Sequence, residues 1–455
     1  MILDENPDIE LHRRRRQRIL DGLGEGWLLL RTAPEATRNG DVHHAWRPGS
    51  DFLYLTGFDE PGALLLASRT GRGRHRAILF VRPRDPAREI WDGRRHGVAG
   101  ARRRFGVDEA FPADEFLPKL LELVPPGSRL FHRLGECAEF DRKMLEAFAR
   151  KAFEQRKRCV PAHPAIVDPS PALALMRRTK DGVELAALRR AAAITVSGHR
   201  LAMAVARPGL REYEVQAVLE AEFKSLGSPR TGYGSIVASG ANACVLHYVS
   251  NDRVMRDGDL LLVDAGAEYS GLTADVTRTF PVNGSFTPAQ RAVYEVVLRA
   301  ELAGIRAARE GARWDAPHRA CVRELTKGLV RLGVLRGSVP ALVAKEKYKP
   351  FFMHGTSHWL GRDVHDVGAY EDESGRPIPL RRGMVLTVEP GLYFGARDRR
   401  VPEDLRGIGI RIEDDVLVTA SGRIVLTESA PKTVRDVERA CSSGRSAARK
   451  PRGRK

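Results

Sequence analysis

Residues 260–277 read LLLVDAGAEYSGLTADVT, and this stretch decides the fold of the C-terminal half of the chain. Four apolar residues lead to Asp264, a turn-prone Tyr-Ser-Gly follows, and a second strand-like run carries Asp275. Two such runs joined by a glycine-containing connection are typical of a β-hairpin. We therefore expect an antiparallel hairpin that brings the two carboxylates to one place.

Three more polar residues lie in or beside apolar, strand-like runs further along the chain. Glu389 closes the run MVLTV, Glu413 follows the run IGIRI, and His358 lies within HGTSHWLGRDVHD. Any single acidic residue at a strand end is more often a cap, a turn former or a surface charge than a ligand. A buried carboxylate without a partner is costly, however, so several of them in one domain indicate cations between them.

The five side chains together also indicate which ions the centre holds. Four carboxylates supply about four negative charges, which balance two divalent cations, and bridging carboxylates suit metals roughly 3.5–4 Å apart. A mostly oxygen donor set with one imidazole and no thiolate favours Mn²⁺, with Co²⁺, Fe²⁺ or Zn²⁺ as alternatives. The sequence therefore predicts a two-metal hydrolytic centre.

The composition is that of an ordinary soluble globular protein of 455 residues, of which 42% are hydrophobic and 29% charged. This length favours two domains. No apolar run approaches the roughly 18–20 residues of a membrane span, so we expect no membrane association. The chain begins without an apolar signal region and its five cysteines lack paired metal spacing, which together favour a cytoplasmic location.

The formal net charge of +17 could indicate a nucleic-acid partner. The excess of arginine is dispersed along the whole chain, however, so we do not expect nucleic acid to be the ligand. Residues 442–455 mix Ser, Gly, Ala, Arg and Lys without apolar anchors. This composition predicts a basic, disordered tail.

A proline-rich stretch between residues 161 and 171 separates two patterns of secondary structure. Before it, strand-like and helical segments alternate, which predicts an α/β domain with its own core. The expected strands there are 27–31, 63–67, 77–81 and 129–132, and the expected helices are 115–123 and 140–153. We place the domains at residues 1–172 and 173–440, with the tail at 441–455.

The second domain begins with an expected helix at 183–206 and later has two more, at 288–310 and 314–332. A pair of helices precedes an antiparallel hairpin twice in succession. This order predicts an α+β domain with an internal pseudo-two-fold repeat, both halves of which contribute ligands. The site would lie between the halves, where pockets often form.

These motifs resemble those of a known family. Segment 354–366, with Asp264, Asp275, Glu389 and Glu413 in their order and contexts, resembles the pita-bread metallopeptidases, which include creatinase and methionine aminopeptidase. The N-terminal domain carries further matches, RNGD at 38–41, WRPGSDFLYLTGF at 46–58 and IWDGRR at 90–95. These matches narrow the resemblance to aminopeptidase P, the Xaa-Pro aminopeptidases.

The resemblance implies a role for each metal ligand. Asp275 and Glu413 would bridge the two metals, Asp264 would bind one of them, and His358 and Glu389 would bind the other. Glu389 would also be the general base that accepts a proton from the attacking water.

The resemblance also implies which residues surround the substrate. Those of the catalytic domain are His247, His354 and His365, which are not ligands, together with Tyr393 and Arg411. His365 and His247 would stabilise the oxyanion, and His247, His354, Tyr393 and Arg411 would lie around a proline pocket. Asp41 and Trp91 would approach from a neighbouring subunit of a homo-oligomer, either a dimer or a tetramer.

The expected function is a manganese-dependent aminopeptidase that releases the N-terminal residue from peptides with proline in second position. Metal-activated hydroxide would attack the peptide carbonyl. One alternative is a prolidase, an Xaa-Pro dipeptidase with the same metal centre, and a more distant one is a non-catalytic pita-bread binding protein. Arg362 departs from the apolar residue common in the family, a change that bears on packing or substrate preference.

Overall fold

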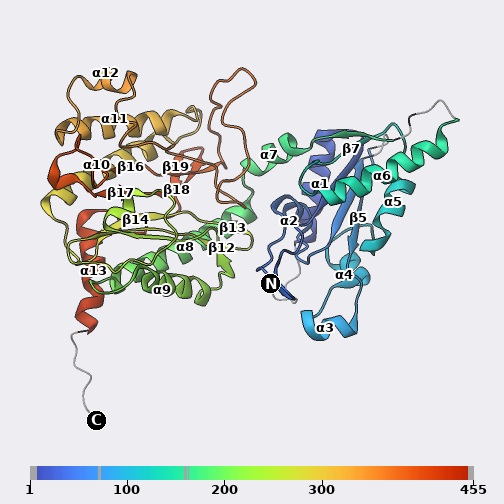
Figure 1. The fold of residues 1–455 in the computed structure, drawn as a ribbon. Helices are drawn as coiled ribbons and strands as arrows, with labels where there is room; N and C mark the ends of the chain where they lie inside the picture. Colours follow the sequence, from blue (N-terminus) through green and yellow to red (C-terminus); the bar gives the residue numbers. More distant parts are fainter. Residues whose placement is uncertain (1–7, 70–72, 158–160, 162, 449–455) are drawn as a thin grey trace, which may run out of the picture. The chain divides into compact units, whose positions relative to one another are not determined.

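The structure is a computed structural model that describes residues 8–69, 73–157, 161 and 163–448. The chain forms two compact units, Met1–Met176 and Arg177–Lys455 (Figure 1). The division falls within helix α7 (Ser170–Arg178), shortly after residue 172, where we placed the domain boundary. None of the described helices is long and apolar enough to cross a bilayer.

A six-stranded mixed sheet forms the centre of the N-terminal unit, in the order β6-β5-β4-β1-β7-β8. β1 pairs antiparallel with β4, and β4 with β5, whereas the other neighbouring pairs are parallel. The strands are β1 (Gly26–Arg31), β4 (Leu64–Arg69), β5 (His75–Val81), β6 (Glu109–Pro112), β7 (Arg129–Phe131) and β8 (Ala165–Val167). A short hairpin, β2 (Thr37–Asn39) with β3 (Val42–His43), stands apart from this sheet.

Both faces of this sheet are covered by helices because successive side chains of a strand point to opposite faces. Leu28 and Leu30 of β1 pack in one core with residues of α1 and α2, while Leu29 packs in a second core with residues of α5 and α6. The helices of the unit before α7 are α1 (Ile9–Leu23), α2 (Ser50–Thr56), α3 (Pro86–Asp92), α4 (Gly97–Arg104), α5 (Phe116–Leu123) and α6 (Ala138–Gln155). The α/β layout expected for this domain is confirmed.

In the C-terminal unit, two pairs of long helices alternate with two groups of antiparallel strands. The first half contains α8 (Gly182–Val205), α9 (Glu212–Ser225), β9 (Arg230–Thr231), β10 (Ile236–Ser239), β11 (Leu260–Asp264), β12 (Ala267–Tyr269), β13 (Leu272–Thr273) and β14 (Thr277–Pro281). The second half contains α10 (Pro288–Ala307), α11 (Ala316–Arg331), α12 (Val339–Ala344), β15 (Val385–Val388), β16 (Gly391–Tyr393), β17 (Gly409–Arg411), β18 (Asp414–Thr419), β19 (Gly422–Val425) and α13 (Val434–Ala448). The repeat of helices followed by strands matches the expected order.

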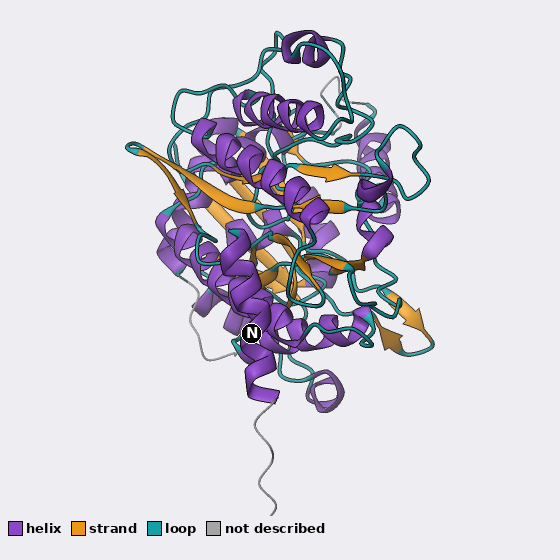
Figure 2. Cartoon of the chain, turned by 90° about the vertical axis from the view of Figure 1, so that its left-hand side faces the viewer, coloured by secondary structure: helices purple, strands orange, loops and turns teal. Residues whose placement is uncertain are grey.

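The strands of this unit form small antiparallel sheets between two helical layers. The sheets have the orders β10-β11-β14, β13-β12-β9 and β15-β18-β19, with β16 and β17 as a separate pair. In Figure 1 the strands lie between α10 and α11 on one side and α8 and α9 on the other, and Figure 2 shows them from a perpendicular direction. One large apolar core, to which both halves contribute, holds the strands and helices together.

Local sequence signals explain where the long helices begin. α8 starts with a capping box, in which the Asp181 side chain accepts from the backbone N–H of Glu184. α10 starts with a second capping box between Thr287 and Gln290 and has proline at its first position. Such caps satisfy the free N–H groups of the first turn. The expected helices at 183–206 and 288–310 therefore form with nearly the predicted limits.

The hairpin predicted from residues 260–277 forms, but a kink divides it into two parts. β11 pairs with β14 so that Asp264 faces Thr277, while β12 and β13 continue beyond the kink in a different sheet. A Cβ on Gly266 would lie 1.7 Å from the carbonyl oxygen of Ala274. Only glycine therefore allows these two segments of the hairpin to approach so closely. Asp275 consequently lies between β13 and β14. The sequence had suggested a position within a strand.

The C-terminal end of the described chain also differs from the expectation. α13 continues to Ala448, and Cys441, where we expected a disordered tail to begin, is buried. Val437 and Cys441 are one helical turn apart and both belong to the large core of the unit. These apolar anchors extend the helix past residue 441. Residues 449–455 of the expected tail lie outside the described residues.

We predict that Gly266→Ala lowers the free energy of unfolding of the C-terminal unit by about 1–3 kcal/mol, the usual cost of inserting a methyl group where no space exists. The control is Gly182→Ala, because Gly182 opens α8 with no atom near its missing Cβ. The control should leave stability unchanged or raise it, since alanine favours the helix. Urea unfolding followed by circular dichroism measures both, and equal stability in the two variants would contradict the kink.

A second prediction concerns a histidine buried in α8. The Nε2–H of His199 donates to the carbonyl oxygen of Ala265 at 3.0 Å, and burial lowers the pKa of His199 to about 4. As the pH falls, His199 therefore takes up a proton near pH 6.5 in the unfolded chain but only near pH 4 in the folded protein. Stability from this group is present above pH 6.5 and is lost as the pH falls toward 4.

Between pH 7 and pH 5 the wild-type protein should thus lose about 2 kcal/mol more of its unfolding free energy than His199→Gln does. Glutamine does not titrate in this range but can still donate a hydrogen bond. Urea unfolding at the two pH values measures the difference between the proteins, in which the titrations of other groups cancel. An equal loss in both proteins would show that His199 does not contribute.

Candidate metal centre

Four of the five predicted ligands lie at or next to strand ends of the C-terminal unit, and both halves of the unit contribute ligands. Asp264 ends β11 and Asp275 precedes β14, while Glu389 follows β15 and Glu413 lies between β17 and β18. The segment of His358 forms a single bridge to β15, at Trp359, in place of the expected strand.

Three of these ligands form a compact group. Asp275, His358 and Glu413 each offer a ligand atom within 4.8 Å of the others, and all three side chains are buried. The Nε2 atom of His358 lies 3.2 Å from Oδ2 of Asp275 and 3.6 Å from Oε1 of Glu389. Four of the five predicted ligands therefore converge directly.

Asp264 joins this group through a tyrosine that the sequence analysis did not identify. The hydroxyl of Tyr233 lies 2.6 Å from Oδ1 of Asp264 and also contacts Oδ1 of Asp275. One hydroxyl hydrogen cannot serve two carboxylates at once. Tyr233 therefore links the two acids but leaves most of their oxygen lone pairs available. Its only local signal is its position between Gly232 and Gly234, which is weak.

The backbone partners of the ligands hold the two halves in register. The N–H of Glu413 donates to the carbonyl oxygen of Thr277 in the first half, and the N–H of Asp275 donates to the side chain of Asp415 in the second half. The hydroxyl of Thr277 donates to Oε2 of Glu413 at 2.6 Å. Each half thus positions a ligand of the other.

The electrostatics of the group indicate that its acids lack countercharge. Burial raises the pKa of Asp275 and, with the charges of Asp275 and Glu389, raises that of Glu413 well above its ordinary value. Burial likewise raises the pKa of Glu389 to about 7. Although burial opposes it, the hydrogen bond to Asp275 and the charge of Glu389 raise the pKa of His358 to about 9. The raised pKa values keep protons on these carboxylates. Divalent cations would balance the carboxylates in place of the protons, so the donor set fits two such ions.

One arginine joins the acids to the residues implied for the substrate. Arg411 donates through Nη2 to Asp264, through Nε to Thr277 at 3.0 Å and through Nη1 to the hydroxyl of Tyr393 at 3.1 Å. That hydroxyl lies 2.8 Å from Nε2 of His354, whose Nδ1 is 3.7 Å from Oε2 of Glu389. A single polar chain therefore runs from Asp264 to Glu389 along one side of the centre.

The other two histidines differ in how firmly they are placed. The ring of His365 lies 4.4 Å from the ring of His358, centre to centre, at an angle of 71°. Burial lowers the pKa of His365, and the charges of His358 and His247 lower it further. His247 is exposed in the loop after the 3₁₀ turn at Gly240–Cys244. It is near enough to affect His365 but is less constrained.

Asp41 and Trp91, by contrast, lie in the N-terminal unit and not in the unit of the metal centre. Asp41 is in the turn of the β2–β3 hairpin and is exposed. Trp91 is in α3 and 84% of it is exposed. They belong to a different unit from the five ligands, so their role is taken up below as a proposal.

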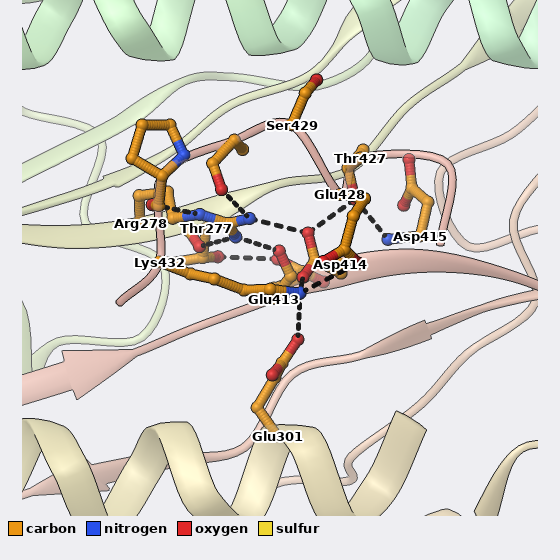
Figure 3. A network of polar contacts seen from close by, with 12 residues as sticks. Thr277, Arg278, Glu301, Glu413, Asp414, Asp415, Thr427, Glu428, Ser429 and Lys432 are labelled. Atoms are coloured by element: carbon orange, nitrogen blue, oxygen red, sulfur yellow. Dashed lines mark hydrogen bonds and ion pairs between the residues drawn. The ribbon is translucent and has the colours of Figure 1, made fainter. Parts of the chain in front are cut away.

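A network of buried charges supports Glu413 from behind (Figure 3). Arg278 donates to the backbone carbonyl of Glu413 and, at 2.7 Å, to the carboxylate of Asp414. Lys432 donates to the same carboxylate at 2.6 Å and lies 3.5 Å from Glu301. Successive residues of β18 and its approach thus point to opposite sides, Glu413 to the ligands and Asp414 to the two cations.

Arg362, the residue that departs from the family pattern, does not join the ligand group. Its Nε lies 3.4 Å from Oε1 of Glu184 at the start of α8, and both side chains are buried. The substitution therefore forms an ion pair between the histidine segment and α8. This outcome favours a role in packing.

Comparison with known proteins agrees with this architecture. The sequence model of metallopeptidase family M24 matches residues 186–420, and that of the aminopeptidase P N-terminal domain matches residues 12–131. The Xaa-Pro aminopeptidase of Escherichia coli (strain K12) is 43% identical over 426 residues, which cover 93% of this chain and 96% of that protein. The Xaa-Pro aminopeptidase of Haemophilus influenzae is 41% identical, over 90% of this chain and 92% of that protein.

Solved structures extend the similarity to three dimensions. The structure of Pseudomonas aeruginosa aminopeptidase PepP matches with a TM-score of 0.93 at 42% identity, over 97% of this chain and 99% of that chain. An Escherichia coli aminopeptidase P variant in complex with substrate matches with a TM-score of 0.92 at 41% identity, over 97% of this chain and 100% of that chain. The expected fold, an α/β domain followed by a pita-bread catalytic domain, is confirmed. The chain therefore belongs to metallopeptidase family M24, in its aminopeptidase P group.

Proposed function

We propose that this protein is a metal-dependent Xaa-Pro aminopeptidase, which removes the N-terminal residue from peptides with proline in second position. The observation that carries the proposal is the buried group of Asp275, His358 and Glu413, with Asp264 and Glu389 beside it. The relatives named Xaa-Pro aminopeptidase support the same activity, since they match nearly the whole chain.

In this proposal two divalent cations occupy the centre. Asp275 and Glu413 would be shared by both ions, Asp264 would hold one, and His358 and Glu389 would hold the other. The oxygen-rich donor set favours Mn²⁺ over Co²⁺, Fe²⁺ or Zn²⁺. One similar solved structure is a zinc-substituted Escherichia coli aminopeptidase P in complex with product, so that protein can hold zinc.

The residues of the centre divide the chemistry among themselves. When bound, two cations would lower the pKa of a shared water toward neutrality and so provide a nucleophile. Glu389 accepts the proton of that water as general base. His365 and His247 donate hydrogen bonds to the oxyanion that develops on the peptide carbonyl. The tight packing of His365 against His358 supports its position in this role.

Proline in second position explains why a dedicated pocket is needed. Its nitrogen carries no hydrogen and its φ is fixed, so it cannot bind as part of an extended strand. We place the pyrrolidine ring near His354, Tyr393 and Arg411, whose polar groups are already joined by hydrogen bonds. A pocket with pre-oriented walls loses little entropy when the ring binds.

The quaternary and cellular context belongs to the same proposal. We propose a homo-oligomer, a dimer or a tetramer, in which Asp41 and Trp91 of one subunit complete the substrate site of another. The high exposure of Trp91 supports an interface at this position, because a large apolar side chain gains stability by being covered. We further propose that the protein acts in the cytoplasm.

The test of the proposed activity is hydrolysis of the tripeptide Arg-Pro-Pro by chelator-stripped protein with and without Mn²⁺. We expect release of free arginine only when the metal is added, because the carboxylates alone provide no nucleophile. Cleavage of an Xaa-Pro dipeptide but not of the tripeptide would instead assign the protein as a prolidase. No cleavage of either substrate with any of the four metals would assign a non-catalytic binding protein.

Variants of Glu413 and His365 separate metal binding from catalysis. Glu413→Ala should lose bound manganese and activity together, because a bridging ligand holds both ions. His365→Ala should keep about two ions per chain but lose roughly 10²–10³-fold in kcat, the usual cost of removing one oxyanion donor. Elemental analysis and steady-state kinetics measure both effects.

The matched control for losing a buried acid is Glu268→Gln, because Glu268 is buried in β12, paired with Arg230 and outside the ligand group. This control should bind metal as the wild-type protein does. Full activity in Glu413→Ala would refute the bridging role, and loss of metal in His365→Ala would make His365 a ligand.

A further inference from the structure

A short loop connects the metal ligand His358 with His365, and both ends of the loop are held together. We define the His365 loop as residues 360–366. The N–H of Asp366 donates to the carbonyl oxygen of Trp359 at 2.8 Å, which closes the loop. Trp359 and Asp366 are thereby held next to each other. The rings of the residues directly before them, His358 and His365, lie 4.4 Å apart, centre to centre.

Two positively charged side chains, those of Lys180 and Arg177, bind the end of this loop, although they lie far from it in the sequence. Lys180 donates through Nζ to Oδ2 of Asp366 at 2.7 Å, and Arg177 donates through Nη2 to Oδ1 of the same carboxylate. All three side chains are almost completely buried, with no more than 2% exposed. Arg177 also reaches Asp363 at 2.7 Å. Both oxygens of Asp366 are thus engaged by a positive charge.

The packing around these three residues leaves no room for adjustment. A Cβ on Gly361 would lie 2.1 Å from Oδ2 of Asp366 and 2.7 Å from Nζ of Lys180. Lys180 is itself fixed, because its N–H donates to the carbonyl oxygen of Gly383 and its Nζ donates to that of Arg177. The loop can therefore approach Lys180 only because residue 361 is glycine.

The charges of this cluster favour an ionised Asp366. Burial alone would raise the pKa of Asp366, but Lys180 and Arg177 outweigh it and hold the pKa below its usual range. A buried carboxylate between two buried cations is strongly oriented, because removing one partner leaves an uncompensated charge. An anchor of this kind, directly after His365 in the sequence, restricts the backbone from which the His365 ring projects.

We propose that Arg177 and Lys180, by holding Asp366, are positioning residues for His365, and that they keep its ring against the metal centre during the reaction. The inference rests on the proposed function, since His365 acts there on the oxyanion. The side-chain hydrogen bonds of Arg177 and Lys180 described above go to Asp363, Asp366 and the backbone carbonyl of Arg177, none of which is a predicted metal ligand. Displacement of a catalytic group by about 1 Å can cost roughly 10²-fold in rate, so a positioning role has a measurable effect.

The main variant is Lys180→Met, which removes one cation but leaves Arg177 paired with Asp366, so the unit can still fold. We expect unchanged manganese content, a KM close to that of the wild-type protein and a kcat lower by roughly 10–100-fold. A second variant, Gly361→Ala, keeps every charge and displaces the loop from Lys180 by its methyl group. It should lower kcat in the same way.

The control is Arg362→Met, because Arg362 lies in the same loop and forms a buried ion pair with Glu184, a different carboxylate from Asp366. It should reduce stability without a selective loss of kcat. The decisive readout is a double-mutant cycle. In a His365→Ala background, Lys180→Met should cause no further loss of kcat, because the residue that it positions is absent.

A crystal structure of Lys180→Met tests the positioning independently of activity, and we expect the His365 ring to leave its contact with His358. An unmoved ring would overturn the inference, and so would an undiminished effect of Lys180→Met in the His365→Ala background or an equal kcat loss in Arg362→Met. If the wild-type protein cleaves no Xaa-Pro peptide, the proposed function fails, whereas the ring position still decides whether Arg177 and Lys180 orient His365.

Discussion

The C-terminal unit is organised around one electrostatic constraint, which is that four carboxylates converge in a buried space where few cationic side chains reach them. Arg411 is the arginine that contacts a ligand carboxylate directly, at Asp264. Burial of such a group is unfavourable unless charge is supplied from outside the chain. Apolar residues next to several of the ligands, such as Val263, Val388 and Ile412, belong to the large core, and their burial offsets this cost.

Two neighbouring acids leave the same stretch of chain on opposite sides and meet different partners. Glu413 points to the ligands, whereas its neighbour Asp414 is enclosed by Arg278, Lys432 and the hydroxyl of Thr427. The alternation of a β-strand permits this arrangement, since consecutive side chains leave on different faces. Asp414, which is paired with cationic side chains, and Glu413, which faces the other predicted ligands, therefore follow from the same local geometry. Arg177, Asp366 and Lys180 repeat the compensated arrangement near His365.

The sequence predicted the features that depend on local patterns. The ligands were recognisable because each lies in or beside an apolar, strand-like run. The starts of α8 and α10 were predicted to within one residue, and both helices begin with a capping box. The kink at Gly266 was not predictable, since it results from the approach of Ala274 and not from the residues around it. For the same reason Tyr233 escaped notice, and the pairing of Lys180 with Asp366 joins residues 186 positions apart. Contacts of this kind have no signature in a short window.

The division of the ligands between the two halves also has a consequence for how the chain acquires its fold. Asp264 and Asp275 are separated from His358, Glu389 and Glu413 by the whole of α10 and α11. The chain between them must close before an ion can meet ligands from both halves, and contacts so distant in sequence form slowly. An ion that needs ligands from both halves would therefore bind after the halves meet. It would stabilise the assembled unit, so metal supply would change how long the native state persists more than how quickly it forms.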